Sequence, residues 1–472
     1  MTKLFKLKLI ALAVSSTLIT ACGDAETNIV EKDPIVVEDE HDHDDDHDHD
    51  DGYTIHSLGR LVVLAGDSNE ASFFDLDNSE LLDTFTLNND SNTLSASPGF
   101  RYAVIANRTQ DYLGFIDGGM WREDHAEHLH DYEQGPAFSS YELTSGSRPT
   151  HLITHDGQLA IFYDGDAETG TPASVEVLTD NDITNATATL TGINYDINMH
   201  GVAEPRGEHL LSTIRRDDAS STSNAKVLPD QVGVYHLHDG NYELEQTLEV
   251  TCPDLHGAAQ NHDYVVFGCG DGVLIAHQQG DEYEAEKIAN IVVVGDLRIG
   301  SIYGHEDSES FIGIASGHGG GGGGGGGGGE AVIVTIKPAT AEMEEVEWQL
   351  ADGASAVSYS FSANGEHFLV LDSLGFLNVL KAHAHDGHTH WELAGQVDIT
   401  EQDVTTMPEG MKFSMTVAQN SQFAYVADPI AQHVVQVHLE DLEVEGELEL
   451  AFPPAAITWL GIAQEEEHAH EH

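Results

Sequence analysis

The segment from Arg122 to Tyr132 concentrates side chains that bind metal ions. It reads R-E-D-H-A-E-H-L-H-D-Y. Neutral imidazole and carboxylate suit Zn²⁺, with thiolate as the softer alternative. His128 and His130 are two residues apart, which places both rings on one side of an extended chain. We therefore predict a metal site whose ligands are His125, His128 and His130, with Asp124 or Asp131 as a further ligand or as the carboxylate that orients one.

The elements that must position this segment are short β-strands. From Leu58 onward, apolar runs with period-two alternation are separated by Gly, Asn and Asp turns, and no convincing amphipathic helix interrupts them. Similar strand starts recur at spacings of roughly 50 residues, which suits a four-stranded propeller blade. The run Leu61–Leu87 supplies only three strands, and Ala455–Ile462 supplies a lone strand that would complete it. We predict a single all-β propeller over residues 55–463 with eight blades, closed by the N- and C-terminal strands; seven blades is the alternative.

Three further histidines share one position of this repeat. The segments P-T-H-L-I, N-M-H-G-V and D-L-H-G-A begin three consecutive blades and contain His151, His200 and His256. Because the first strand of each blade lines the central channel, these rings should meet near one mouth of it. There they could ligate a metal or orient a substrate. The alternative is that they only hydrogen-bond to neighbouring backbone.

The two histidine groups are expected on different faces of the ring. The 124–131 segment falls between the third and fourth strands of its blade, and such connections emerge opposite the face where first strands begin. We therefore expect two separate sites, unless the 124–131 loop folds over or into the channel. The sequence leaves open whether the two groups share one metal.

Other histidine-rich stretches are candidates for accessory metal binding. Residues 38–51 alternate histidine with carboxylates, which predicts a disordered tether within residues 23–54. A hairpin loop at Ala382–Trp391 and a short tail at residues 464–472 repeat this composition. A solvated acidic linker and a plain hairpin are the alternatives. The accessory candidates are His41, His43, His47, His49, His383, His385, His388 and His390.

The charge and the N-terminus indicate an extracytoplasmic protein that attracts cations. The chain of 472 residues has 18 Lys and Arg against 82 Asp and Glu, which argues against nucleic acid and anionic membranes as partners and favours cations or a basic protein. Residues 1–22 have the basic start and short apolar run of a signal peptide, ending in I-T-A-C. We predict that Cys22 is lipidated and anchors the chain in the periplasm, at the outer membrane of a Gram-negative cell. Ordinary secretion is the alternative.

The sequence also allows predictions for the two remaining cysteines and for the glycine run. Cys252 and Cys269 would pair as a disulfide in an oxidising compartment, whereas a zinc–thiolate site would need two more ligands nearby. Gly319–Gly329 is expected to be a flexible loop rather than a phosphate-binding loop, because no Lys-Ser/Thr follows it.

These motifs together resemble the bacterial periplasmic zinc metallochaperones of the AztD type. The resemblance covers roughly residues 55–463. It depends most on D-H-A-E-H-L-H-D at 124–131, on N-M-H-G at 198–201 and D-L-H-G at 254–257, and on the pair Cys252/Cys269. The resemblance implies a non-enzymatic protein that binds Zn²⁺ and passes it to the solute-binding protein of a zinc ABC importer. We expect a monomer. The I-T-A-C lipidation motif departs from this family if its members are soluble periplasmic proteins.

Two other functions remain open from the residues alone. A propeller enzyme, such as a lyase or a metal-dependent hydrolase or oxidoreductase, would use the channel histidines as a base or as ligands of a catalytic metal. The chain has no C-x-x-C-H haem attachment and no serine nucleophile elbow that would favour this. An interaction scaffold with metal-buffering tails is the other alternative.

Overall fold

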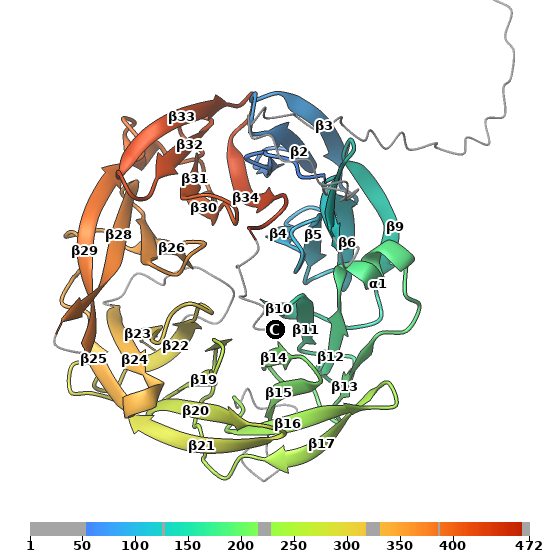
Figure 1. The fold of residues 1–472 in the computed structure, drawn as a ribbon, viewed down its shortest axis with the longest axis vertical. Helices are drawn as coiled ribbons and strands as arrows, with labels where there is room; N and C mark the ends of the chain where they lie inside the picture. The colour runs from blue at the N-terminus through green and yellow to red at the C-terminus, as the bar shows by residue number, and fades with distance from the viewer. Residues whose placement is uncertain (1–52, 125–127, 216–227, 318–330, 386–387, 465–472) are drawn as a thin grey trace, which may run out of the picture.

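The structure, a computed structural model, is a ring of eight four-stranded antiparallel sheets, which we number as blades 1–8 (Figure 1). It describes residues 53–124, 128–215, 228–317, 331–385 and 388–464. The prediction of an eight-bladed propeller is confirmed, and the alternative of seven blades is wrong.

Blades 1–4 contain the following strands, in order from the innermost outward. Blade 1 contains β34 (Pro454–Leu460), β1 (Arg60–Ala65), β2 (Glu70–Asp75) and β3 (Leu81–Thr86), and blade 2 contains β4 (Thr93–Ala96), β5 (Tyr102–Asn107), β6 (Tyr112–Asp117) and β9 (Ala137–Leu143). Blade 3 contains β10 (Pro149–His155), β11 (Gln158–Tyr163), β12 (Ser174–Leu178) and β13 (Thr191–Asn194), and blade 4 contains β14 (Ala203–Arg206), β15 (His209–Ile214), β16 (Gln231–His238) and β17 (Asn241–Thr247).

Blades 5–8 repeat this order. Blade 5 contains β18 (Ala258–Gln260), β19 (Tyr264–Cys269), β20 (Gly272–Gln279) and β21 (Glu282–Ala289), and blade 6 contains β22 (Arg298–Tyr303), β23 (Phe311–Ser316), β24 (Val332–Lys337) and β25 (Glu342–Glu345). Blade 7 contains β26 (Ala356–Phe361), β27 (His367–Asp372), β28 (Phe376–His385) and β29 (His388–Asp398), and blade 8 contains β30 (Ser414–Val417), β31 (Phe423–Asp428), β32 (His433–His438) and β33 (Glu443–Glu449).

A few elements lie outside the blades. The hairpin β7 (Met120–Asp124) and β8 (Leu129–Glu133) is inserted between β6 and β9. The helix α1 (Asp180–Asn185) starts at Thr179 with a capping box, and two 3₁₀ turns cover Pro338–Thr340 and Val404–Thr406. Among the helices of the described ranges, none is long and apolar enough to cross a membrane.

The core lies between neighbouring blades. The second strand of a blade is buried along most of its length, and β5 and β27 along all of theirs, because neighbouring blades cover both of its faces. Outer strands alternate instead, and β17 shows mostly exposed residues around a buried Tyr242. The short apolar runs of the sequence therefore form inner strands, and the period-two runs form the rim.

The two ends of the chain close the ring within blade 1. β34 pairs antiparallel with β1, from Arg60 opposite Leu460 to Ala65 opposite Pro454. The buried indole of Trp459 donates its Nε1–H to the carbonyl oxygen of Leu58 at 2.8 Å. This closing pair is the one predicted from the lone C-terminal strand.

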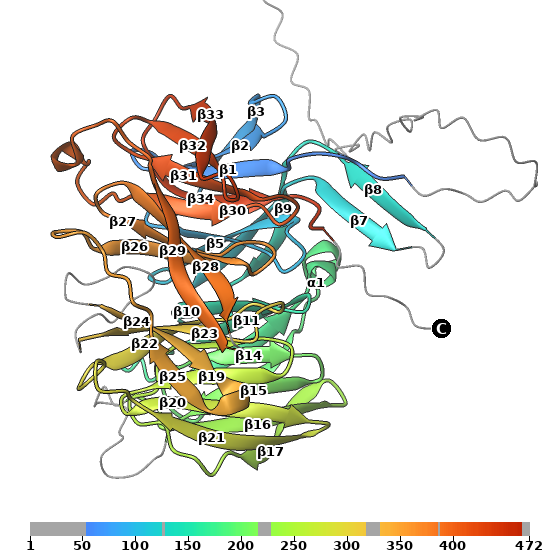
Figure 2. The same ribbon diagram turned by 60° about the vertical axis from the view of Figure 1, so that its left-hand side comes forward.

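The direction of the strands gives the ring two distinct faces. Innermost strands begin at one face, which we call the entry face. The turns from first to second strand and from third to fourth strand lie at the other, which we call the hairpin face. The β7–β8 hairpin projects beyond the ring on this side (Figure 2). β34 ends there and β1 begins there, so the described chain also enters and leaves at the hairpin face.

Candidate metal centre

Three histidines converge where three consecutive blades begin at the channel. His151 lies on β10, and His200 and His256 lie just before β14 and β18. The Nε2 atoms of His151 and His200 are 3.2 Å apart, and one nitrogen from each of the three rings lies within 4.8 Å of the others. Around tetrahedral zinc, with bonds of about 2.0–2.1 Å, ligand nitrogens are about 3.3 Å apart. The three rings therefore need only small adjustments to ligate one ion.

Two of the three rings are oriented by hydrogen bonds on their other nitrogen. The Nδ1 of His200 lies 3.1 Å and 3.2 Å from the carboxylate oxygens of Asp164, and Arg108 donates to the same carboxylate at 2.8 Å. The Nδ1 of His256 donates to the carbonyl oxygen of Gly300 at 2.8 Å. A carbonyl oxygen only accepts, so the proton of His256 is on Nδ1 and the lone pair is on Nε2. That Nε2 is buried and has no hydrogen-bond partner among the described residues.

Burial and nearby charges keep His151, His256 and Asp164 in their metal-binding protonation states. Burial, followed by the neighbouring His200 and His256, lowers the pKa of His151 to about 3. Burial is also the main reason that the pKa of His256 is lowered. Burial alone would raise the pKa of Asp164, but its contacts with His200 and Arg108 outweigh that effect and lower it. At neutral pH the site therefore offers neutral His151 and His256 imidazoles beside an ionised Asp164.

The glycine after each of two histidines allows this close approach. Gly257 has φ of +74°, and a Cβ there would lie 2.6 Å from the carbonyl oxygen of Gly300, the acceptor of His256. A Cβ on Gly201 would collide with Thr213 and with the ring of Phe162. The H-G motif is thus a packing requirement that holds the imidazole against the adjoining blade.

The β7–β8 hairpin uses part of the 124–131 segment for structure. Asp131 is 1% exposed and accepts hydrogen bonds from Arg122 at 2.6 Å and 3.0 Å. It also accepts the backbone N–H of Ile55 at 2.7 Å, which fixes the start of the described chain to the hairpin. Asp131, which the sequence predicts to be a ligand or to orient one, therefore forms an ion pair and also anchors the start of the described chain.

The structure places the other residues of that segment as follows. The rings of His128 and His130 have centroids 4.7 Å apart, as expected for residues two apart on extended chain. Asp124 pairs with Leu129 across the hairpin, and His125 lies outside the described residues. The hairpin belongs to the hairpin face, whereas His151, His200 and His256 lie at the entry face. His128 and His130 therefore lie at the opposite face from the channel histidines, as the strand order of the blade predicts.

The remaining candidate residues for metal binding or modification lie at the rim or outside the described residues. The β28–β29 hairpin pairs His383 with His390 and His385 with His388. The tether residues His41, His43, His47 and His49, the lipidation candidate Cys22, the glycine run and the tail after Gln464 lie outside the described residues. Cys252 and Cys269 form a disulfide, as expected.

Sequence reasoning missed the groups that orient the channel histidines. Asp164 directly follows β11, and Tyr163 of that strand pairs with Pro149 of β10. The available signal was a carboxylate at the end of a strand that pairs with the start of a histidine-bearing strand. That signal could be used only if the pairing of β10 with β11 was known. Gly300 acts through its backbone oxygen and left no side-chain signal.

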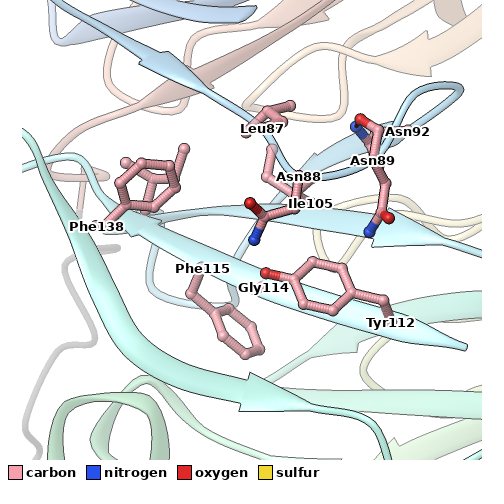
Figure 3. A pocket seen from close by; sticks show the side chains of 10 residues that line it. Leu87, Asn88, Asn89, Asn92, Ile105, Tyr112, Gly114, Phe115 and Phe138 are labelled. Atoms are coloured by element: carbon pink, nitrogen blue, oxygen red, sulfur yellow. Dashed lines mark hydrogen bonds between the residues drawn. The ribbon is translucent and has the colours of Figure 1, made fainter. Parts of the chain in front are cut away.

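A surface hollow between blades 1 and 2 has no comparable chemistry. It is lined by apolar side chains together with Asn88, Asn89, Asn92 and Tyr112 (Figure 3). It contains no histidine, carboxylate or cysteine. The channel cluster, rather than this hollow, is the candidate functional site.

Comparisons with known proteins support an AztD-like propeller. A comparison with protein-family models finds no match. The zinc chaperone AztD of Citrobacter koseri is 24% identical over 221 residues, and the match spans 47% of this chain and 48% of that protein. The chain thus matches about half the length of this curated relative.

Solved structures show the same fold over a larger part of the chain. Two crystal structures of Citrobacter koseri AztD, one of them the apo form, match with TM-scores of 0.66 and 0.67 at 20% identity, covering 86% of this chain and 99% of theirs. A dihydro-heme d1 dehydrogenase, NirN, matches with a TM-score of 0.54 at 12% identity, covering 86% of this chain and 76% of that one. At these identities the structural likeness concerns the fold, which proteins of different function share.

Proposed function

We propose that this chain is an extracytoplasmic zinc metallochaperone, which captures Zn²⁺ and passes it to the solute-binding protein of a zinc ABC importer. The observation that carries the proposal is the convergence of His151, His200 and His256, with Nδ1 of two rings held by Asp164 and Gly300. Imidazoles oriented in this way form a preorganised zinc site. The sequence match to a protein named as a zinc chaperone supports the same reading.

The site is suited to holding an ion that must later be released. Three protein nitrogens leave one position of a tetrahedral zinc open for water or for an incoming ligand. The His200 side chain is 25% exposed, so the cluster is reachable from solvent at the entry face. A partner's ligand can therefore enter the open position before the first histidine leaves, and the ion is never fully released.

The histidines elsewhere are proposed to collect zinc at lower affinity. The His/Asp-rich tether, the tail and the β28–β29 loop offer many exchangeable ligands, which raise the local zinc concentration near the ring. His128 and His130 on the hairpin face, together with their sequence neighbour His125, are proposed as a second, weaker site in the same role. Lipidation of Cys22 would keep the collector in the periplasm, at the outer membrane. The partner and the monomeric state belong to this proposal.

One observation favours an enzyme as the second candidate. Three histidines with an open fourth position are also the ligand set of catalytic zinc, in which the metal lowers the pKa of a bound water. A zinc-dependent hydrolase would use the same three residues. The two functions differ in what happens to the metal, since an enzyme keeps it and a chaperone gives it away.

The experiment is a transfer assay with the zinc-loaded chain and a purified zinc-free solute-binding protein from a zinc importer. We expect the metal to move to the partner faster than it moves to a small chelator of equal affinity. Transfer no faster than spontaneous dissociation would contradict the chaperone, and turnover of an activated ester by the zinc form would favour the enzyme. A His151→Ala/His200→Ala variant controls for the central site.

A further inference from the structure

A second cluster of imidazoles and carboxylates lies at the rim of blade 4, on the hairpin face. It consists of His236 and His238 at the end of β16, Glu245 on β17, and His209 with Glu208 at the start of β15, and we call it the rim cluster. We propose that the rim cluster is a further binding site for Zn²⁺ or a similar divalent transition metal, separate from the channel site and from the β7–β8 hairpin. The proposal stands whether or not the channel histidines hold zinc.

The ligand atoms are already close together. The Nε2 of His238 lies 2.7 Å from Oε1 of Glu245, and the Nδ1 of His236 lies 3.5 Å from Oε2 of the same carboxylate. One ligand atom from each of these three residues falls within 4.8 Å of the others. Glu208 adds a carboxylate oxygen 3.7 Å from Nε2 of His236. Imidazole with carboxylate is a ligand set for zinc and its neighbours in the first transition row.

The local backbone explains why three side chains from two strands meet here. His236 and His238 are two apart on β16 and so point to the same side of the sheet. The register between β16 and β17 shifts at Val234/Tyr235, where Gln246 and Leu244 have partners and Glu245 is the extra residue. Such a bulge re-aims a side chain that regular pairing would place elsewhere. It brings the Glu245 carboxylate to the two imidazoles.

His209 supplies the observation that points to a missing ligand. It pairs with His236 across β15 and β16, and the two rings stack with centroids 4.6 Å apart. His209 is only 6% exposed, yet its Nε2 has no hydrogen-bond partner among the described residues. Buried polar atoms normally have a hydrogen-bond partner or a ligand, and a metal ion or a metal-bound water would supply one to this nitrogen.

The charge around the rim cluster favours a cation. The acidic side chains that act on His209 are Glu208, Glu245 and Asp281, and those that act on His238 are Glu245, Glu243 and Asp239. Placing a divalent ion among these carboxylates relieves their mutual repulsion. The side chains of His238 and Glu245 are 45% and 43% exposed, so the ion would exchange with solvent more readily than at the channel. The rim cluster therefore suits transient holding on the face where the described chain begins and ends.

The test is zinc protection of individual histidines in the intact chain. Diethyl pyrocarbonate acylates an imidazole that is neither protonated nor bound to metal, and mass spectrometry locates each modified residue. At pH 7.5 we expect zinc to slow the modification of His236 and His238 about tenfold when nine-tenths of the sites are filled. His262, which is 86% exposed on the neighbouring blade, is the bystander and should change little.

Two variants make the result specific. Glu245→Gln should weaken the protection of His236 and His238 and leave the protection of His151, His200 and His256 as in the wild type, which also reports that the ring is folded. The matched control Glu243→Gln removes a charge from the same strand without removing a ligand. Lack of protection at His236 and His238 in the wild type, protection equal to that of His262, or protection that is unaffected by Glu245→Gln would each overturn the proposal.

Discussion

At the scale of single residues, the channel site depends on groups that never touch the metal. His200 and His256 each offer Nε2 because Nδ1 is occupied, by Asp164 in one case and by the Gly300 carbonyl in the other. Asp164 is in turn held by Arg108 at 2.8 Å. Contacts with His200 and Arg108 lower the pKa of Asp164, and the ionised carboxylate fixes the orientation of the His200 ring.

We therefore predict that Asp164→Asn weakens zinc binding at the channel by roughly 10–100-fold, the usual loss when the partner of a ligand histidine is removed. The measurement is competition against a chelator of known affinity. Asp166→Asn is the matched control, because Asp166 lies two residues away and pairs with Arg148 instead. An affinity equal to that of the control would contradict the orienting role of Asp164.

The pH dependence of zinc binding should differ between the two faces. Only neutral imidazole ligates, so protons compete with zinc below the pKa of each ring. Burial lowers the pKa of His151 to about 3 and lowers that of His256, which postpones this competition to more acid solution. The bond to Glu245 raises the pKa of the exposed His238, so protons compete there at higher pH.

Acidification from pH 7.5 to about 5.5 should therefore strip zinc from the rim and the tails before the channel, since free histidine titrates near 6.5. Zinc-dependent protection of each histidine, followed across this range, reports the order. Simultaneous loss at both faces would show that burial does not set the stability of the channel site.

At the scale of elements, the position of each channel histidine is set by the start of a blade. A strand start recurring with the blade period could be recognised in the sequence, and this is why His151, His200 and His256 could be placed together before the structure was known. Asp164 could not be placed beside them, because its position next to the channel histidines follows from the pairing of β10 with β11. Composition also gave no sign that Asp131 of the 124–131 segment forms a buried ion pair with Arg122. The metal site expected on that segment stays a prediction.

The disulfide is the element that ties His256 to blade 5. Cys252 and Cys269 are 17 residues apart in sequence, and the loop that they close contains both His256 and Gly257. Closing a loop of this length stabilises the folded state by about 3 kcal/mol in the chain-entropy account. Both cysteines are fully buried in the cluster between blades 4 and 5.

We predict that Cys252→Ala/Cys269→Ala lowers the free energy of unfolding by about 3 kcal/mol. It should also weaken zinc binding, because the segment before β18 loses a restraint. Denaturant unfolding and chelator competition measure the two effects. Reduction of the wild-type chain is the control and should reproduce both; unchanged zinc affinity would show that the Gly300 contact alone positions His256.

At the scale of the whole molecule, ring closure joins residues from opposite ends of the chain. β34 supplies the innermost strand of blade 1, and Trp459 packs into the cluster shared by blades 8 and 1. The count of eight blades could be deduced from the sequence because one N-terminal run lacked a strand and one C-terminal strand lacked a blade. That the two histidine groups lie at different faces could be predicted from strand direction alone. That Asp131 anchors the hairpin could not be predicted in this way.

Truncation should reveal how much depends on this closure. Removing residues 465–472 leaves β34 intact and should not change the unfolding midpoint. Ending the chain at Leu450 removes β34 and exposes the partners of Trp459, so we expect loss of cooperative unfolding. Thermal denaturation of the two chains decides it, and a cooperative transition in the shorter one would contradict closure by β34.

The most direct test of the account is where the tightly held zinc resides. The intact chain is loaded with zinc and dialysed against a chelator that removes weakly held ions, and the remaining zinc is counted. We predict about one equivalent in the wild type and in His128→Ala/His130→Ala, and none in His151→Ala/His200→Ala/His256→Ala, because three convergent imidazoles form the preorganised site. Retention by the triple variant together with loss in the double variant would contradict the central claim and move the tight site to the hairpin face.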